Sequence, residues 1–360
     1  MRKLVFVIEH LRGGGAERVT AALMNELCCE EEVHLVSTYH HDETDEYPTD
    51  PRIIKHTIWP QRGSWLGLIR DRVVFLRKTI TEIAPDCVVS LATTRTNILI
   101  AAALLGKRIP VVLSERNDPR RDPASKVIRL LRYWIYSTCN GLVFQTTEAR
   151  DFFPKWISRK SVVICNPLTG NLPPCHEGTR EPRIINCCRL TVQKNLDLLI
   201  DAFSDIAAEF PAMRLDILGE GEERKRLEQK IAAMGLRERI CLPGYSNNVY
   251  QEMRKCSLFV SSSDYEGISN SMLEAMALGV PVICTDCPAG GAREVIRNGE
   301  NGFLVPTGDR AAMADAMRRV LKDDELAGRM SRGGAMLRWE IAPAVIARKW
   351  MDYVNGIISR

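Results

Sequence analysis

The chain has 360 residues, 45% of them hydrophobic, and a formal net charge of +4. This length and content supply apolar side chains for two cores rather than one. No stretch approaches the roughly 20 consecutive apolar residues of a membrane span. The short apolar run Leu4–Ile8 is followed at once by Glu9 and lacks the small-residue cleavage site of a signal peptide. We therefore expect a cytoplasmic protein that is soluble or peripheral to a membrane.

The charge is unevenly distributed along the chain. Residues 51–165 contain 20 lysines and arginines against eight acidic residues, whereas residues 1–50 contain four against eleven. A basic excess confined to one part of the chain indicates an anionic partner there. The basic residues carry no nucleic-acid recognition motif and no glycine-aromatic signature of RNA-binding sheets, so nucleic acid is not the expected partner.

The twelve cysteines do not form a recognisable metal or disulfide pattern. Cys284 and Cys287 have CxxC spacing, but no second half-site accompanies them. Without a secretion signal, reduced and buried thiols are expected. The sequence therefore predicts no metal site.

Strands alternate with helices through the first half. The strand Lys3–Ile8 leads into a glycine-rich loop, Arg12–Arg18, and a helix that runs to about Cys29. Such a loop lets the backbone approach a ligand closely, although it lacks the GxGxxG fingerprint and a plain tight turn is the alternative. An acidic loop, residues 40–50, is expected to be mobile. The pattern indicates a doubly wound domain, with further strands at Val33–Ser37, Cys87–Leu91, Val111–Ser114, Leu142–Phe144 and Val162–Cys165.

Two stretches of this half combine basic and aromatic residues. The first, Trp65–Ala84, has apolar residues at helical spacing, and the second runs from Arg116 to Ile135. A core-facing helix with a solvated basic face explains each one alone. Two of them in one half favour docking on an anionic membrane surface.

The second half repeats the alternation of strands and helices after a segment rich in proline and glycine. We divide the chain into a first domain (residues 1–168), a linker (169–182), a second domain (183–340) and a C-terminal helix (341–360) that packs back on the first domain. The predicted elements of the second domain are a strand to Cys187, a helix Asn195–Glu209, a strand Arg214–Leu218, a helix Glu222–Met234, and strands at Ile240–Leu242, Cys256–Val260 and Val280–Cys284.

The segment Ser261–Cys287 reads as a strand, a polar loop, a helix from Asn270 to Leu278 and a second strand. Glu266 and Glu274 flank the start of the helix, where the amides of Asn270, Ser271 and Met272 favour an anion such as phosphate. The alternative is structural, because Ser271 and Glu274 have the spacing of a capping box.

Four motifs occur in a fixed order in the second half: RLTVQKN from Arg189, LGEGE from Leu218, LPG from Leu242, and EGISNSMLE from Glu266 to Glu274. The chain resembles retaining glycosyltransferases of family 4 over nearly its whole length. The resemblance implies an α/β architecture called GT-B, in which two Rossmann-like doubly wound domains face a cleft. The first would bind the acceptor and the second the nucleotide sugar. GGGAER, SERNDP and DCPAGGAREVI are most similar to bacterial enzymes of capsule, O-antigen or N-glycan precursor assembly, which extend glycans on undecaprenyl diphosphate.

The resemblance also implies roles for individual residues. Arg189 and Lys194, with the helix amides near Ser271, would stabilise the departing diphosphate in place of a metal ion, since the sequence has no Asp-x-Asp motif. Glu266 would lie against the donor sugar and Glu274 would bind the ribose. Gly14, Gly15, Gly219, Asn270 and Met272 complete the expected donor side. Arg18, Glu115, Arg116 and Asn117 form the expected acceptor side; many relatives have a His where Glu115–Asn117 stands.

We thus expect a metal-independent retaining hexosyltransferase that needs no cofactor. It would use a UDP-sugar as donor and a polyprenyl-diphosphate-linked glycan as acceptor, at the inner face of the plasma membrane. One alternative is a sugar-nucleotide epimerase-like enzyme of the same fold, which would release UDP without an acceptor. The other is a catalytically silent partner subunit that binds glycan.

Overall fold

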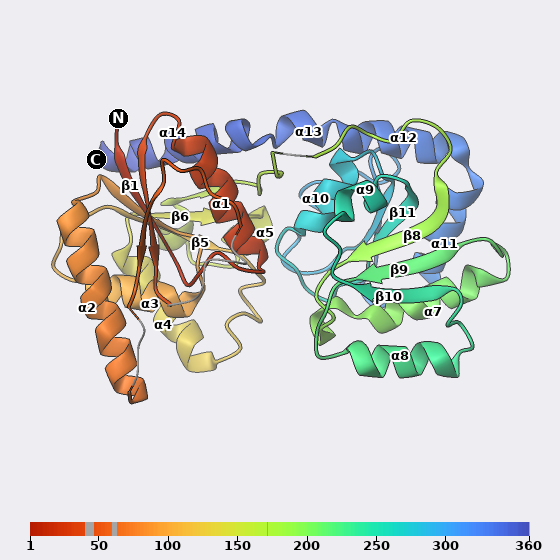
Figure 1. The fold of residues 1–360 in the computed structure, drawn as a ribbon, viewed down its shortest axis with the longest axis horizontal. Coiled ribbons are helices and arrows are strands. Elements are labelled where there is room, and N and C mark those ends of the chain that lie inside the picture. Colours follow the sequence, from red (N-terminus) through yellow and green to blue (C-terminus); the bar gives the residue numbers. More distant parts are fainter. Residues whose placement is uncertain (40–46, 60–62, 171, 360) are drawn as a thin grey trace. The chain divides into compact units, whose positions relative to one another are not determined.

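The computed structural model describes residues 1–39, 47–59, 63–170 and 172–359. Most of the acidic loop expected to be mobile, residues 40–46, lies outside the described residues. The chain forms two compact units, each built around its own parallel sheet (Figure 1). The first comprises Met1–Gly170 and Ile341–Arg360, and the second comprises Asn171–Glu340.

The sheet of the first unit has seven parallel strands in the order β3-β2-β1-β4-β5-β6-β7. The strand order reverses between β1 and β4, which makes this a doubly wound sheet with a switch point at the carboxyl ends of these strands. The strands are β1 (Lys3–Ile8), β2 (Glu32–Ser37), β3 (Ile54–Thr57), β4 (Cys87–Ser90), β5 (Val111–Glu115), β6 (Gly141–Phe144) and β7 (Ser161–Val163).

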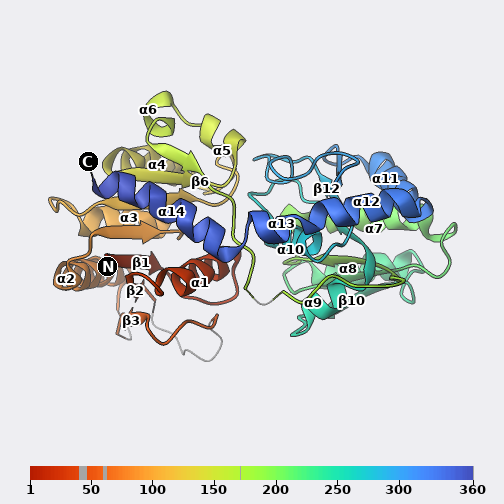
Figure 2. The same cartoon turned by 90° about the horizontal axis from the view of Figure 1, so that it is seen from above.

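Helices cover both faces of this sheet (Figures 1 and 2). α1 packs beside α14 on one face, and α2, α3 and α4 follow one another on the other. The central strands are therefore nearly continuous apolar runs, such as the buried segment Leu4–Ile8. The helices are α1 (Gly15–Leu27), α2 (Trp65–Ile83), α3 (Thr94–Ala103), α4 (Lys126–Thr138), α5 (Thr147–Asp151), α6 (Lys155–Ser158) and α14 (Pro343–Ile358).

A tyrosine attaches the C-terminal helix to an outer part of the first sheet. The Tyr353 hydroxyl accepts a hydrogen bond from the Leu142 amide at 2.9 Å and donates one to the Lys160 carbonyl at 2.5 Å. Gly141 leaves room for the ring, because a Cβ there would lie 2.6 Å from the Tyr353 oxygen. α14, which is far from β6 and β7 in the sequence, thus provides hydrogen-bond partners for backbone groups of β6 and of the turn before β7.

The sheet of the second unit has six parallel strands in the order β10-β9-β8-β11-β12-β13. α7 packs against α11 on one face, and α10 packs against α12 on the other (Figure 1). The strands are β8 (Glu181–Cys187), β9 (Arg214–Leu218), β10 (Ile240–Gly244), β11 (Cys256–Ser261), β12 (Val282–Thr285) and β13 (Phe303–Val305). The helices are η2 (Val192–Lys194, a 3₁₀ turn), α7 (Leu196–Ala207), α8 (Arg224–Ala233), α9 (Val249–Met253), α10 (Asn270–Ala277), α11 (Arg310–Lys322), α12 (Asp324–Ala335) and α13 (Leu337–Glu340).

Element boundaries differ from the sequence predictions at several places. β3 was not predicted, because the half-exposed segment Ile54–Thr57 lacks a buried apolar pattern. β12 begins two residues later than predicted, at Val282, since Gly279 ends the preceding helix with φ +71 and Pro281 has no amide hydrogen. The glycine-rich loop is shorter than predicted, because α1 already begins at Gly15.

The segment predicted as a linker is held to the second unit over most of its length. Arg338 donates to the carbonyl oxygens of Leu172 and Pro173, and Arg254 donates to that of Pro174. Arg180, which is itself in this segment, donates from its guanidinium to the carbonyls of Arg254, Cys256 and Gly279 in the second unit. Residues 172–180 therefore lie on the second unit, and Glu181 and Pro182 already belong to β8.

Candidate functional site

In the second unit, the two catalytic candidates Lys194 and Glu266 meet although they are 72 residues apart. The Lys194 ammonium forms an ion pair with Glu266 Oε2, and the Ser263 hydroxyl donates to the same oxygen at 3.2 Å. Burial opposes the charge of Lys194, but the carboxylate outweighs this effect and raises the pKa of the lysine. The side chains are 13% and 20% exposed, so the pair remains accessible to a ligand.

A tight turn places Lys194. The next residue, Asn195, has φ +42, and its side chain both caps α7 at the Leu198 amide and donates to Asp264 at 2.8 Å. The Ser262 hydroxyl donates to the Lys194 carbonyl at 2.8 Å, and the Asp264 amide donates to the Gln193 carbonyl at 2.9 Å. The loop that carries Glu266 is therefore fastened to the turn that carries Lys194.

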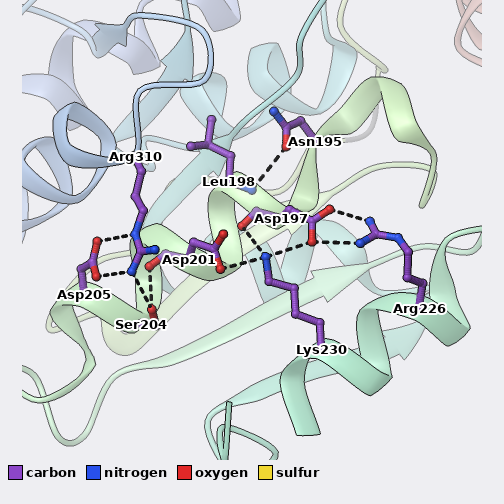
Figure 3. A network of polar contacts seen from close by, with 9 residues as sticks. All are labelled: Asn195, Asp197, Leu198, Asp201, Ser204, Asp205, Arg226, Lys230 and Arg310. Atoms are coloured by element: carbon purple, nitrogen blue, oxygen red, sulfur yellow. Dashed lines mark hydrogen bonds and ion pairs between the residues drawn. The ribbon is translucent and has the colours of Figure 1, made fainter. Parts of the chain in front are cut away.

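The helix that follows this turn is fixed by a network of charges (Figure 3). Asp197 binds Arg226 and Lys230 of α8, and Asp205, two turns further along α7, pairs with Arg310 of α11. Each partly exposed pair contributes only about 0–1 kcal/mol. Together they join α7, α8 and α11, and hold the start of α7 next to Lys194.

The backbone of Glu266 is held from its other side by the loop after β12. The Glu266 amide donates to the Pro288 carbonyl at 2.7 Å, and the Ala289 amide donates to the Glu266 carbonyl at 3.1 Å. A Cβ at Gly291 would lie 1.7 Å from the Gly267 carbonyl oxygen. The segment DCPAGGAREVI, which the sequence singled out, thus supports the loop that bears Glu266.

The start of α10 differs from the capping box considered from the sequence. Ser269, and not Ser271, is the N-cap, and its hydroxyl accepts from the Met272 amide at 3.4 Å. The capping-box interpretation was wrong because the helix begins at Asn270, two residues earlier than a Ser271 cap requires. Glu274 is buried one turn further along, where it accepts a hydrogen bond from the Tyr250 hydroxyl at 3.1 Å.

Gly219 allows the loop that carries Arg189 to approach the end of β9. Its φ is +130, and a Cβ there would lie 1.9 Å from the Cys188 carbonyl oxygen. Backbone hydrogen bonds join the two segments on both sides, from the Cys188 amide to the Leu218 carbonyl and from the Leu190 amide to the Glu220 carbonyl. Arg189 stands between them with an exposed side chain.

In the first unit, the glycine candidates lie where β1 meets α1. Gly14 is the N-cap of α1, and Gly15 and Arg18 lie in its first turn. Glu9, at the carboxyl end of β1, accepts hydrogen bonds from the hydroxyls of Thr93 and Thr96 at the start of α3. Gly14, Gly15 and Arg18 are thus at the same carboxyl edge of the sheet as the end of β5.

The other acceptor-side candidates follow β5 and include buried charges. Glu115 accepts hydrogen bonds from Arg132 at 3.0 Å and from the Tyr136 hydroxyl at 2.9 Å. Burial raises the pKa of Glu115 to about 7, although the positive charge of Arg132 opposes this rise. Arg116 donates to Ser114 and to Asn166, and burial lowers its pKa to about 10.

The structure thus gathers the candidate residues in two groups. Arg189, Lys194, Gly219, Glu266 and Asn270–Glu274 are in the second unit. Gly14, Gly15, Arg18 and Glu115–Asn117 are in the first. Sequence reasoning missed Ser263, Tyr250, Arg132 and Tyr136, because single polar residues that contact a site across the fold carry no spacing signal.

Two buried thiols, Cys188 and Cys287, lie near Lys194 and Glu266. Burial raises the pKa of both Cys188 and Cys287 to about 12, so each stays protonated at neutral pH. In the part of the chain that the structure describes, no group of three or more His, Cys, Asp and Glu side chains is arranged to hold a metal ion.

Comparisons with known proteins identify the class to which this chain belongs. The profile described as "Glycosyl transferases group 1" matches residues 176–335, and the profile "Glycosyltransferase Family 4" matches residues 13–169. The chain is a glycosyltransferase. Together with the two parallel α/β sheets of the GT-B fold, these matches place it in glycosyltransferase family 4.

Two curated relatives and one solved structure match almost the whole chain. A Campylobacter jejuni protein named N-acetylgalactosamine-N,N'-diacetylbacillosaminyl-diphospho-undecaprenol 4-alpha-N-acetylgalactosaminyltransferase is 27% identical, over 99% of this chain and 100% of its own length. The amylovoran biosynthesis glycosyltransferase AmsD of Erwinia amylovora is 23% identical, over 99% and 100%. The crystal structure of Anabaena HepE in complex with UDP and glucose superimposes with a TM-score of 0.84 at 20% identity, over 99% and 100%.

Replacing Gly219 by alanine should destabilise the second unit. The substitution forces an L residue into a left-handed conformation, which costs about 1–2 kcal/mol, and it also drives a Cβ into the Cys188 carbonyl. Chemical unfolding measures the loss. Gly235→Ala is the matched control, because Gly235 has φ +69 but nothing within 4 Å of its Cβ position. Equal losses in the two variants would contradict the close approach inferred at Gly219.

The pH dependence of stability should report the burial of Glu115. Its folded-state pKa of about 7 exceeds its ordinary value of 4.5. The contribution of the protonated Glu115 carboxyl group to the free energy of unfolding is complete below pH 4.5, and it is lost as the pH rises through 7. Relative to Glu115→Gln, the free energy of unfolding of the wild type should therefore fall by about 3 kcal/mol over this range. Denaturant titrations at several pH values test this, and a constant difference between the two proteins would refute it.

Proposed function

We propose that this protein is a retaining glycosyltransferase that moves a hexose or N-acetylhexosamine from a UDP-sugar to a glycan on undecaprenyl diphosphate. The reaction would serve the assembly of a cell-surface polysaccharide such as a capsule or O-antigen. The observation that carries the proposal is the Lys194–Glu266 pair in the second unit, beside the loop of Arg189.

The second unit has the groups that a diphosphate leaving group requires. As the bond between sugar and phosphate breaks, negative charge develops on the β-phosphate, and fixed cations lower the barrier. Lys194 and Arg189 supply such cations, and the first turn of α10 adds its helix dipole. Because the sequence has no Asp-x-Asp motif, we propose that these groups act in place of a metal ion.

Glu266 is proposed to face the donor sugar. In the structure its carboxylate is held by Lys194 and Ser263, so a sugar that hydrogen-bonds to Glu266 would lie beside the cation that binds the diphosphate. Glu274 would bind the ribose, with Tyr250 orienting its carboxylate. Gly14 and Gly15 are proposed to approach the phosphates or the acceptor.

The acceptor is proposed by similarity to relatives. The Campylobacter jejuni relative is named for transfer to a diphospho-undecaprenol-linked sugar, and AmsD for amylovoran biosynthesis. Arg18, Arg116 and Asn117 would contact the acceptor at the carboxyl edge of the first sheet.

The outer face of α4 supports a peripheral position at the inner face of the plasma membrane. Val127, Leu130, Leu131 and Trp134 follow one face of the helix at helical spacing, and each is at least 42% exposed. Residues 51–165 also have a strong excess of basic over acidic residues, as an anionic bilayer requires. In α2, Arg77 is instead used to cap α3 at the carbonyls of Ala103 and Leu105. No described helix has the length and hydropathy of a membrane span.

Lys194→Ala should abolish sugar transfer and weaken UDP binding while the fold is kept. Removal of a single preorganised cation typically costs about 10²–10³ in rate. Calorimetric titration with UDP, GDP and NAD without added metal measures binding, and a transfer assay with UDP-sugars and membrane lipid extract measures turnover. Lys225→Ala, which removes an exposed lysine of α8, is the control.

The same measurements separate the rival functions. Full transferase activity in Lys194→Ala would contradict the proposal that Lys194 binds the diphosphate. Wild-type binding of GDP alone would change the donor class, and release of UDP without an acceptor would favour the epimerase. Binding of none of the three nucleotides would favour a silent partner subunit.

Leu130→Glu should weaken binding to phosphatidylglycerol vesicles by about 10- to 100-fold, since burying one leucine contributes about 1.5–3 kcal/mol. Vesicle co-sedimentation measures the bound fraction, with phosphatidylcholine vesicles as the neutral reference. Leu66→Glu, at a residue of α2 that is 69% exposed, is the matched control and should bind as the wild type does. If Leu66→Glu loses vesicle binding and Leu130→Glu does not, the docking surface is on α2 and the proposal for α4 is wrong.

A further inference from the structure

The loop between β5 and α4 is held in place by a buried arginine. Arg132 lies on α4 and is only 1% exposed. Its guanidinium donates to three groups at once, namely the Glu115 carboxylate at 3.0 Å and the carbonyls of Pro119 and Asp122, both at 2.8 Å. We propose that Arg132 is a positioning residue, which sets the conformation of residues 116–122 for the acceptor. This inference rests on the proposed function for its acceptor.

The three acceptors of Arg132 span the loop from end to end. Glu115 is the last residue of β5, Pro119 is in the middle of the loop, and Asp122 is near its far end. One planar guanidinium thus connects the strand, the loop and the helix. A lysine has one nitrogen and lacks the fork of donors that reaches three separate oxygens.

The surroundings keep the guanidinium in one orientation. Its carbon lies 4.9 Å from the centroid of the Phe153 ring, and the Tyr136 hydroxyl holds the same Glu115 oxygen at 2.9 Å. Since Arg132 and Glu115 are both buried, a different arrangement of either would leave a charge without its partner. These contacts of Arg132, which we call the Arg132 clamp, therefore favour the observed geometry.

The loop itself is organised around Asp118, which is also 1% exposed. The amides of Arg121 and Asp122 donate to the Asp118 carbonyl at 3.1 and 2.8 Å, and the Arg120 amide donates to the Asp118 carboxylate at 3.0 Å. Asn117 donates from its side chain to Asp122 at 3.2 Å. These bonds connect Asn117 to Asp122, so the Arg132 clamp at Pro119 and Asp122 also restrains Asn117, the neighbour of Arg116.

The same helix faces outward with the apolar residues proposed to contact the membrane. Leu130, Leu131 and Trp134 are exposed, whereas Arg132 on the other side holds the loop through the Pro119 and Asp122 carbonyls. Arg129 adds a further hydrogen bond to the Arg120 carbonyl. A lipid-linked acceptor that reaches the loop from the bilayer would thus meet residues whose positions are set from the membrane-facing helix.

The test distinguishes two effects of removing Arg132, namely a change in the conformation of the loop and a general loss of stability. Arg132→Met removes the charged partner of the buried Glu115 carboxyl group, which itself destabilises the fold. The double variant Arg132→Met/Glu115→Gln removes both charges and should regain stability, but the Pro119 and Asp122 carbonyls still lack their donor. Glu115→Gln alone is the matched control, because it removes the same carboxylate and leaves the hydrogen bonds of Arg132 to the Pro119 and Asp122 carbonyls in place.

Two readouts are compared among these proteins. Hydrogen–deuterium exchange follows the amides of Arg121 and Asp122. Transfer assays with a panel of UDP-hexoses and UDP-N-acetylhexosamines and membrane lipid extract give the apparent KM for the acceptor, and calorimetry gives the Kd for UDP. In the double variant we expect loop exchange to become about tenfold faster or more and the acceptor KM to rise by a similar factor, with UDP affinity unchanged, because each lost charge-assisted bond contributes about 1.5–3 kcal/mol. In Glu115→Gln alone, loop exchange should stay near the wild type, and the change in acceptor KM is taken relative to this variant.

Loop exchange that stays at the wild-type rate in the double variant would overturn the clamp, whatever the transferase assays give. Faster exchange with an unchanged acceptor KM would overturn the role toward the acceptor. If the wild type binds UDP but transfers no sugar to the lipid extract, the proposed acceptor class fails, while the exchange experiment still decides whether Arg132 holds the loop.

Discussion

The second unit depends on the contact between Lys194 and Glu266, two opposite charges that are largely removed from solvent. Such a pair is stable only where the backbone holds both partners close, because burial of each charge alone is costly. The fold meets this requirement from three sides. Asn195 and Asp264 fasten the two loops, the charge network along α7 fixes the helix after Lys194, and the loop after β12 supports Glu266.

This arrangement is suited to a group that binds and leaves as an anion. In the proposed function, the ammonium is already oriented by a carboxylate, so a diphosphate that binds it would require little reorganisation. Close backbone approaches complete the site, since Gly219 and Gly291 occupy positions at which a Cβ would collide with a neighbouring carbonyl. The glycines therefore shape the loops around the Lys194–Glu266 pair, and the charged residues are those proposed to contact the donor.

In the first unit, too, a buried charged group is held by fixed partners, but the partners come from a helix. Its buried carboxyl group at the end of β5, Glu115, is held by Arg132 and Tyr136 from α4 rather than by a neighbouring loop. Burial raises the pKa of Glu115 to about 7 and lowers the pKa of Arg116 to about 10. A helix with an exposed apolar face and a buried polar face thus connects the surface of the unit with the end of its sheet.

The sequence by itself determined the alternation of strands and helices, the final helix Pro343–Ile358, and the candidates Arg189, Lys194, Glu266 and Glu274, because hydrophobic periodicity and motif spacing are local properties. It could not determine which of these residues meet. The pairing of Lys194 with Glu266 follows from the adjacency of β8 and β11 in the sheet. The edge strand Ile54–Thr57, the cap at Ser269 and the buried guanidinium of Arg132 were likewise decided by tertiary structure, since each depends on partners that only the packed fold supplies.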